Sequence, residues 1–294
     1  MAQRRWLTDI LLVVCLFLAG VGAGEARESL SVFVSIPPQK YFVERVAGET
    51  VKVSVMVKPG ADPVTYEPSP RQMAELSEAK AYFRIGVPFE AAWLSRLRQN
   101  QPNLAIVDTR EGITLRAIEG HAHGPHGMDK EKAMPDPHIW LSPRLVKKQA
   151  ETIYLALVDL NPDEAATYLE NYQLFVKDLE AIDQQIRSII GNGRGRKFMV
   201  FHPAWGYFAD EYGLQQIPIE VEGKEPSAKE LARIIDQAHR DNIKVIFVQS
   251  QFNTKPAETI AKAVSGRVVQ LDPLAEDYLT NLVVMAEAIG AEAR

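Results

Sequence analysis

Apolar positions along the chain follow two periods, one typical of strands and one typical of helices. Short apolar or alternating runs such as VKVSVMV predict strands, because successive strand side chains point to opposite faces. Segments with apolar residues three and four positions apart separate these runs and predict helices. The first half of the chain therefore predicts four strands with helices between them, at residues 29–36, 51–57, 81–85 and 104–107.

The second half of the chain repeats this alternation. Its predicted strands lie at residues 198–201, 216–221, 245–248 and 268–271. Strands that alternate with helices are typical of a parallel sheet covered by helices. We therefore predict an α/β fold with two lobes, each built on a parallel sheet, an N-terminal lobe at residues 27–160 and a C-terminal lobe at residues 192–294.

Between the two lobes, residues 161–191 carry one uninterrupted helical pattern. Pro162 begins this helix, Asp163 and Glu164 lie in its first turn, and Gly191 ends it. Proline and acidic residues both favour a helix N-terminus. About 28 residues at 1.5 Å each make a rigid helix about 42 Å long. We expect it to join the lobes, with a ligand cleft between them at the carboxyl ends of the strands.

The first 26 residues have the pattern of a secretory signal peptide. Arg4 and Arg5 precede an almost continuous apolar run at residues 10–21, and small residues follow up to Ala26. We predict cleavage near Ala26 and a periplasmic location, with an uncleaved N-terminal anchor as the alternative. Cys15 lies in this leader, so the exported protein contains no cysteine.

Composition narrows the possible chemistry. The 294 residues carry a formal net charge of −5, which gives no electrostatic reason to bind nucleic acid. One cysteine excludes a disulfide framework and a thiolate-caged zinc or iron–sulfur site. Any metal site must therefore use the six histidines and oxygen ligands.

Three polar side chains stand next to prolines where a predicted strand or loop ends. They are His138, His202 and Asp272. A strand end places a side chain at the functional edge of a sheet, and a neighbouring proline restricts the local backbone. Two imidazoles and a carboxylate suit Zn²⁺, and less exclusively Mn²⁺ or another divalent metal. Taken singly, a histidine at a strand end is more often a structural residue than a metal ligand.

Five sequence motifs follow one another along the chain. They are GADPVTYEPSP at 60–70, DPHIWLSP at 136–143, FHPAWGYF at 201–208, VEGKEP at 221–226 and LDPLA at 271–275. In this order they resemble the motifs of the metal-specific (zinc/manganese type) periplasmic solute-binding proteins of bacterial ABC importers. The resemblance implies capture of a divalent metal, zinc favoured, and its delivery to an ABC permease and its ATPase by a monomer without enzymatic activity. It also implies metal ligands at His138, His202 and Asp272.

One position departs from the family pattern. The family usually has a further histidine ligand in the first motif, where this chain has Val64, which cannot coordinate a metal. Water could fill the open position, or the protein could have lost tight zinc binding and carry something else. A nearby side chain could also take the place, and the possible fourth ligands are Glu67, Glu225, His121, His123 and His126.

A long segment at residues 110–135 contains the sequence HAHGPHG and little apolar periodicity. The resemblance implies a loop that gathers zinc or tunes its transfer, and a solvated linker is the alternative.

Two competing functions remain open at this point. One is a metal-handling or adhesion accessory that is not coupled to import. The other is a zinc hydrolase that uses the open coordination position, with Glu67 or Glu225 as general base.

Overall fold

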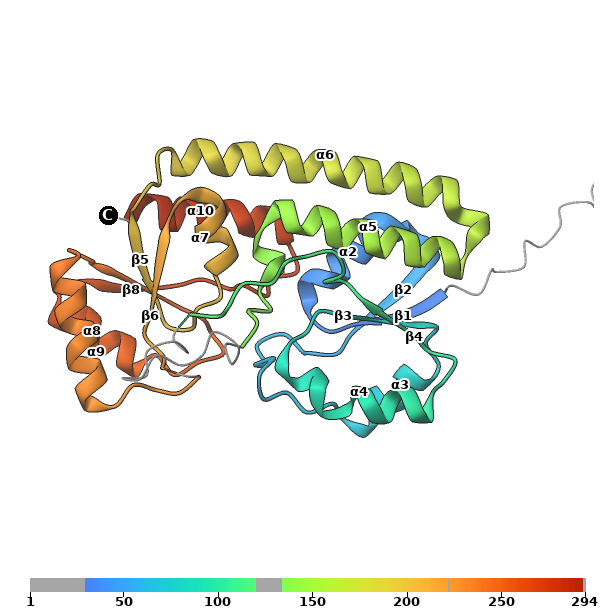
Figure 1. The fold of residues 1–294 in the computed structure, drawn as a ribbon, viewed down its shortest axis with the longest axis horizontal. Helices are drawn as coiled ribbons and strands as arrows, with labels where there is room; N and C mark the ends of the chain where they lie inside the picture. The colour runs from blue at the N-terminus through green and yellow to red at the C-terminus, as the bar shows by residue number, and fades with distance from the viewer. Residues whose placement is uncertain (1–29, 120–133, 222, 293–294) are drawn as a thin grey trace, which may run out of the picture.

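Two parallel sheets form the framework of the computed structural model, which describes residues 30–119, 134–221 and 223–292 (Figure 1). The strand orders are β2-β1-β3-β4 and β6-β5-β7-β8, and all neighbouring strands are parallel. The predicted α/β fold with two parallel-sheet lobes is confirmed. The predicted leader and the three histidines of the HAHGPHG sequence lie outside the described residues.

The first sheet alternates with helices that begin at prolines. Proline suits a first helical turn because its φ is already helical and the amide hydrogen it lacks would be unsatisfied there. The strands are β1 (Leu30–Val34), β2 (Val51–Val55), β3 (Ala81–Arg84) and β4 (Ala105–Asp108), and the helices are α2 (Pro37–Ala47), α3 (Pro70–Ser77) and α4 (Pro88–Asn100).

The second sheet has the same alternation. All four residues of its central strand β7 are buried, as expected for a parallel strand covered on both faces. The strands are β5 (Lys197–Val200), β6 (Gln215–Pro218), β7 (Val245–Val248) and β8 (Arg267–Gln270), and the helices are α7 (Gly206–Tyr212), α8 (Ala228–Arg240) and α9 (Lys255–Ala263).

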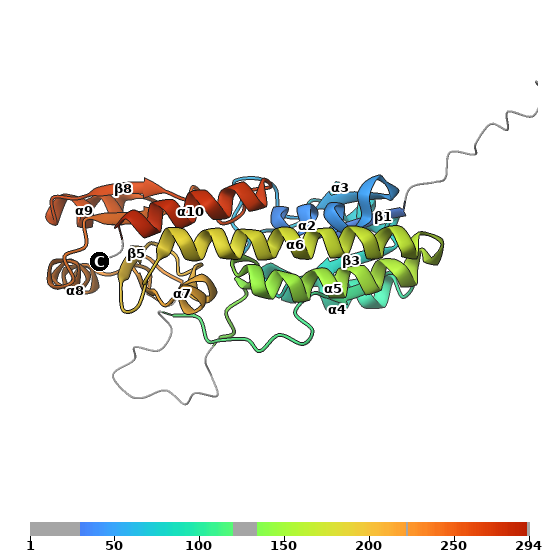
Figure 2. The same cartoon turned by 90° about the horizontal axis from the view of Figure 1, so that it is seen from above.

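A long helix, α6 (Ala165–Ile190), runs along both lobes (Figure 1). Figure 2 shows α5 (Pro143–Leu160) beside it at the first lobe and α10 (Tyr278–Glu292) beside it at the second. The predicted linking helix is therefore present, but its first turn, Pro162–Glu164, is a 3₁₀ helix. Although α6 has 26 residues, no helix in the described ranges combines the length and apolar character of a membrane span.

Trp140 connects the segment before α5 to the segment at the start of α10. Its side chain is 1% exposed, and its indole Nε1 donates a hydrogen bond to the Pro273 carbonyl at 2.8 Å. The Tyr278 hydroxyl donates to the Trp140 carbonyl at 2.6 Å. These two bonds hold the segment that precedes α5 against the segment that precedes α10.

We expect Trp140→Phe to destabilise the protein more than a matched change elsewhere, because it leaves a buried carbonyl without its donor. Trp93→Phe is the control, since the Trp93 Nε1 is buried without a hydrogen-bond partner among the described residues. The free energy of unfolding should fall by about 1–3 kcal/mol more for Trp140→Phe. Urea denaturation followed by circular dichroism measures this difference, and equal losses would contradict the assignment.

Candidate metal centre

The carboxyl ends of the strands of both sheets meet at a cleft between the lobes. The cleft has a volume of about 470 Å³. Gly86 and Arg110 line it from the first lobe, after β3 and β4, and His202 and Gln251 line it from the second, after β5 and β7. The predicted ligand cleft is therefore present, where parallel sheets place their ligands.

Two of the three predicted ligands face each other in this cleft. His138 Nε2 lies 3.2 Å from His202 Nε2, and the two side chains come from different parts of the chain, the segment before α5 and the end of β5. The ring centroids are 5.0 Å apart with an interplanar angle of 68°. His138 is 7% exposed and His202 is 8% exposed, so the pair is almost fully withdrawn from solvent.

A carboxylate orients each imidazole by bonding to Nδ1, the ring nitrogen that faces away from the other imidazole. Asp136 Oδ1 lies 2.7 Å from His138 Nδ1, and Glu220 Oε1 lies 2.8 Å from His202 Nδ1. A carboxylate accepts hydrogen bonds, so in the neutral rings both Nδ1 atoms carry the hydrogen. Both Nε2 lone pairs therefore point into the space between the rings, the arrangement that metal-ligating histidines require.

The geometry of the pair matches a bridging cation. Two lone pairs at 3.2 Å repel each other unless a positive charge lies between them. In a tetrahedral site with Zn–N distances near 2.0–2.1 Å, two nitrogen ligands are roughly 3.3–3.4 Å apart. Burial lowers the pKa of His138, although the neighbouring Asp136 acts in the opposite direction, so the neutral, ligating form is favoured.

Aromatic rings and further polar groups enclose the pair. Phe252 stacks on the His202 ring at 5.0 Å, and Trp140 lies 5.0 Å from the His138 ring. The Tyr207 hydroxyl donates to the Asp136 carbonyl at 2.9 Å, which secures the segment that carries the orienting carboxylate. This low-dielectric surrounding strengthens electrostatic interactions at the two imidazoles.

Asp272, the third predicted ligand, is not brought together with the histidines. Its Oδ1 accepts hydrogen bonds from the Leu274 amide at 2.9 Å and from Gln251 Nε2 at 3.3 Å. Within the described residues, no group of three or more histidine, cysteine, aspartate and glutamate side chains could hold one metal ion. A ligand role for Asp272 stays a prediction.

The candidates for a fourth ligand differ in whether they line the cleft. Val64 lines the cleft and is 44% exposed, so a ligand at this position would face the metal site. Glu67 and Glu225 are both exposed and neither lines the cleft, and Glu225 accepts a hydrogen bond from Asn253 at 2.8 Å. The structure does not describe His121, His123 or His126.

Sequence reasoning missed the two orienting carboxylates. Asp136 lies two residues before His138, and its backbone-restricting neighbour Pro137 is a signal that could have indicated the contact. Glu220 is 18 residues from His202 and reaches it because β5 and β6 pair in parallel register. The pairing of strands, and not local sequence, brings this carboxylate to the imidazole.

The fold and the paired imidazoles are those of a two-lobed binding protein with a candidate metal site in the cleft. The family model for "ZnuA: Zinc-uptake complex component A periplasmic" matches residues 32–291. The chain therefore belongs to this family of periplasmic, metal-specific solute-binding proteins of ABC importers, as its motifs predict.

Individual relatives agree with this membership. The high-affinity zinc uptake system protein ZnuA of Bacillus subtilis is 26% identical over 285 residues, covering 92% of this chain and 89% of the relative. A crystal structure of ZnuA is 45% identical with a TM-score of 0.83, covering 90% and 99% of the two chains. The laminin-binding protein Lmb of Streptococcus agalactiae, described as a bifunctional adhesin and metal transporter, is 25% identical with a TM-score of 0.79, covering 90% and 99%.

We expect Glu220→Gln to weaken zinc binding about 10- to 100-fold, because an amide orients and polarises the His202 ring less well than a carboxylate. Competition with a fluorescent chelator measures the zinc affinity. Glu170→Gln, at an exposed position of α6, is the matched control and should leave the affinity unchanged. An unchanged affinity in Glu220→Gln would contradict the proposed orientation of His202.

We expect Val64→His to tighten zinc binding by about tenfold, or roughly 1.4 kcal/mol, because it adds an imidazole to the lining of the cleft. Val64→Leu occupies the same position without a donor atom and should not tighten binding. Isothermal titration calorimetry distinguishes the two variants. If Val64→His leaves the affinity unchanged, another group already completes the coordination.

Proposed function

We propose that the protein captures Zn²⁺ in the periplasm and delivers it to an ABC permease and its ATPase. The observation that carries this proposal is the pair of Nε2 atoms 3.2 Å apart, each in a ring oriented by a carboxylate. Imidazole ligands favour zinc over manganese, which prefers oxygen ligands. Family membership and the zinc-uptake relatives support the same cargo.

Capture and release use ligand geometry and no chemical step. His138 and His202 come from the two lobes, so a bound cation joins the lobes and favours the closed cleft. Asp272 is our proposed third ligand. It follows β8 at the same edge of the second sheet as His202, and its Oδ2 accepts no hydrogen bond from a described residue, so it is available when the lobes approach.

The proposed boundaries follow from the sequence pattern. The leader is residues 1–26, cleaved near Ala26, and the linking helix at 161–191 separates an N-terminal lobe at 27–160 from a C-terminal lobe at 192–294. The protein acts as an exported monomer that does not bind nucleic acid.

Hydrolysis is not part of this proposal. A zinc-bound water would need a general base within hydrogen-bond reach. Glu67 and Glu225, the two residues considered for that role, do not line the cleft in the described part of the chain. An accessory role in adhesion is not part of this proposal either.

We expect protein with both cleft imidazoles intact to bind about one Zn²⁺ in the cleft, and His202→Ala to abolish this binding because only His138 and the proposed ligand Asp272 then remain. His121, His123 and His126 are replaced by alanine in every sample, so that they contribute no zinc. His239→Ala, at an exposed position of α8, is the control.

Two measurements test this prediction. The first is elemental analysis of the protein after dialysis, and the second is the growth, under zinc limitation, of a strain that depends on this protein. Stoichiometric zinc in His202→Ala at micromolar metal would overturn the assignment of the cleft. Loss of zinc without loss of growth would separate binding from import.

A further inference from the structure

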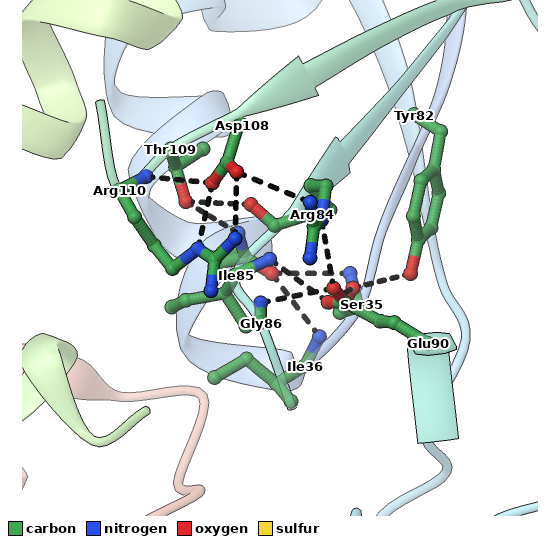
Figure 3. Close-up of polar contacts among 11 residues, drawn as sticks. Ser35, Ile36, Tyr82, Arg84, Ile85, Gly86, Glu90, Asp108, Thr109 and Arg110 are labelled. Carbon is green, nitrogen blue, oxygen red and sulfur yellow. Dashed lines mark hydrogen bonds and ion pairs between the residues drawn. The ribbon is translucent and has the colours of Figure 1, made fainter. Parts of the chain in front are cut away.

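An arginine lies in the lining of the cation-binding cleft. Arg110 follows β4 and shares the cleft with His138 and His202. Its Nε and Nη2 donate to the two oxygens of Asp108 at 2.9 and 2.7 Å (Figure 3). No hydrogen bond from its Nη1 to a described residue is present, and the side chain is 22% exposed. Asp108 therefore holds the Nε/Nη2 edge of the guanidinium, while Nη1 remains available to donate to a ligand.

A buried polar network holds this arginine in place. Arg84 bridges Asp108 at 3.2 Å and Glu90 at 3.1 Å, and Glu90 is completely buried (Figure 3). Glu90 also accepts from the Gly86 amide at 2.9 Å. A Cβ at Gly86 would lie 2.3 Å from Arg110 Nη1, so a glycine is needed for the guanidinium to lie against this backbone.

Arg110 offers the cleft N–H donors rather than a net positive charge, because the Asp108 carboxylate neutralises its guanidinium. Such donors bind an acceptor oxygen that arrives with the metal and give nothing to a bare cation. Its planar N–H donors match the geometry of a carboxylate. Because Asp108 already restrains the side chain, little conformational entropy is lost when Nη1 binds a ligand.

The cleft is also larger and more apolar than a single ion needs. A volume of about 470 Å³ falls within the range of about 300–1,000 Å³ for small-molecule pockets. Its apolar lining includes Leu115, Ile118, Phe252 and Leu274. Such a surface contributes nothing to the coordination of an ion but packs well against the carbon atoms of an organic ligand.

We propose that the cleft takes Zn²⁺ together with a small carboxylate-bearing chelator. An oxygen of the chelator completes the coordination that Val64 leaves open, and a further carboxylate of the chelator binds Arg110. This inference rests on the proposed function, because His138 and His202 hold the metal in both. It identifies the cargo as a zinc–carboxylate complex.

Citrate is the probe, titrated into zinc-loaded protein by calorimetry. Each variant is first loaded to one zinc per chain, verified by elemental analysis. We expect saturable 1:1 binding of citrate with zinc retained, and a ternary mass in native mass spectrometry. Arg110→Gln should weaken citrate binding tenfold or more, and Arg71→Gln, an exposed arginine of α3, should not change it.

Val64→His provides a second, independent variant. Its imidazole takes the coordination position that the chelator would use, so citrate binding should weaken although zinc binds. The inference is overturned if citrate does not bind or if it removes the zinc. It is also overturned if Arg110→Gln and Val64→His bind citrate with the affinity of the wild type. Failure of the wild-type protein to load zinc, with or without citrate, would instead overturn the proposed function.

Discussion

The structure depends on one electrostatic constraint, the approach of two imidazole lone pairs to 3.2 Å. Asp136 and Glu220 turn the acceptor nitrogens of His138 and His202 toward each other and keep the hydrogens on the opposite side of each ring. A cation between the two nitrogens relieves the repulsion between the lone pairs, as does a proton shared in an N–H···N hydrogen bond. A cation bound by both rings would join the segment before α5 to the end of β5.

The rest of the fold serves to hold these two rings at a definite separation. The helix α6 spans both lobes, and Trp140 ties the crossing segment to the start of α10. Both devices limit how far the lobes can move apart. Aromatic neighbours such as Phe252 exclude water, so the interaction between imidazoles and cation is weakly screened.

Prediction from the sequence succeeded where the signal is periodic or local. The two α/β lobes and the linking helix follow from hydrophobic period, and His138 and His202 were identified from their places beside prolines. Asp272 was identified in the same way, yet its Oδ1 is hydrogen-bonded in a turn with Leu274. Arg110 drew no attention, because its place in the cleft depends on how β4 pairs with β3.

The sequence by itself determined the class of fold and marked His138 and His202 as candidate ligands, because both follow from short-range spacing and residue identity. The departure at Val64 came from the resemblance of the first motif to the family pattern. Only the tertiary structure decided which carboxylates orient the rings and that an arginine faces the same cleft. Glu220 meets His202, and Arg110 joins the cleft, through parallel strand pairing and the approach of two lobes. Those contacts arise from long-range packing, which local sequence patterns do not encode.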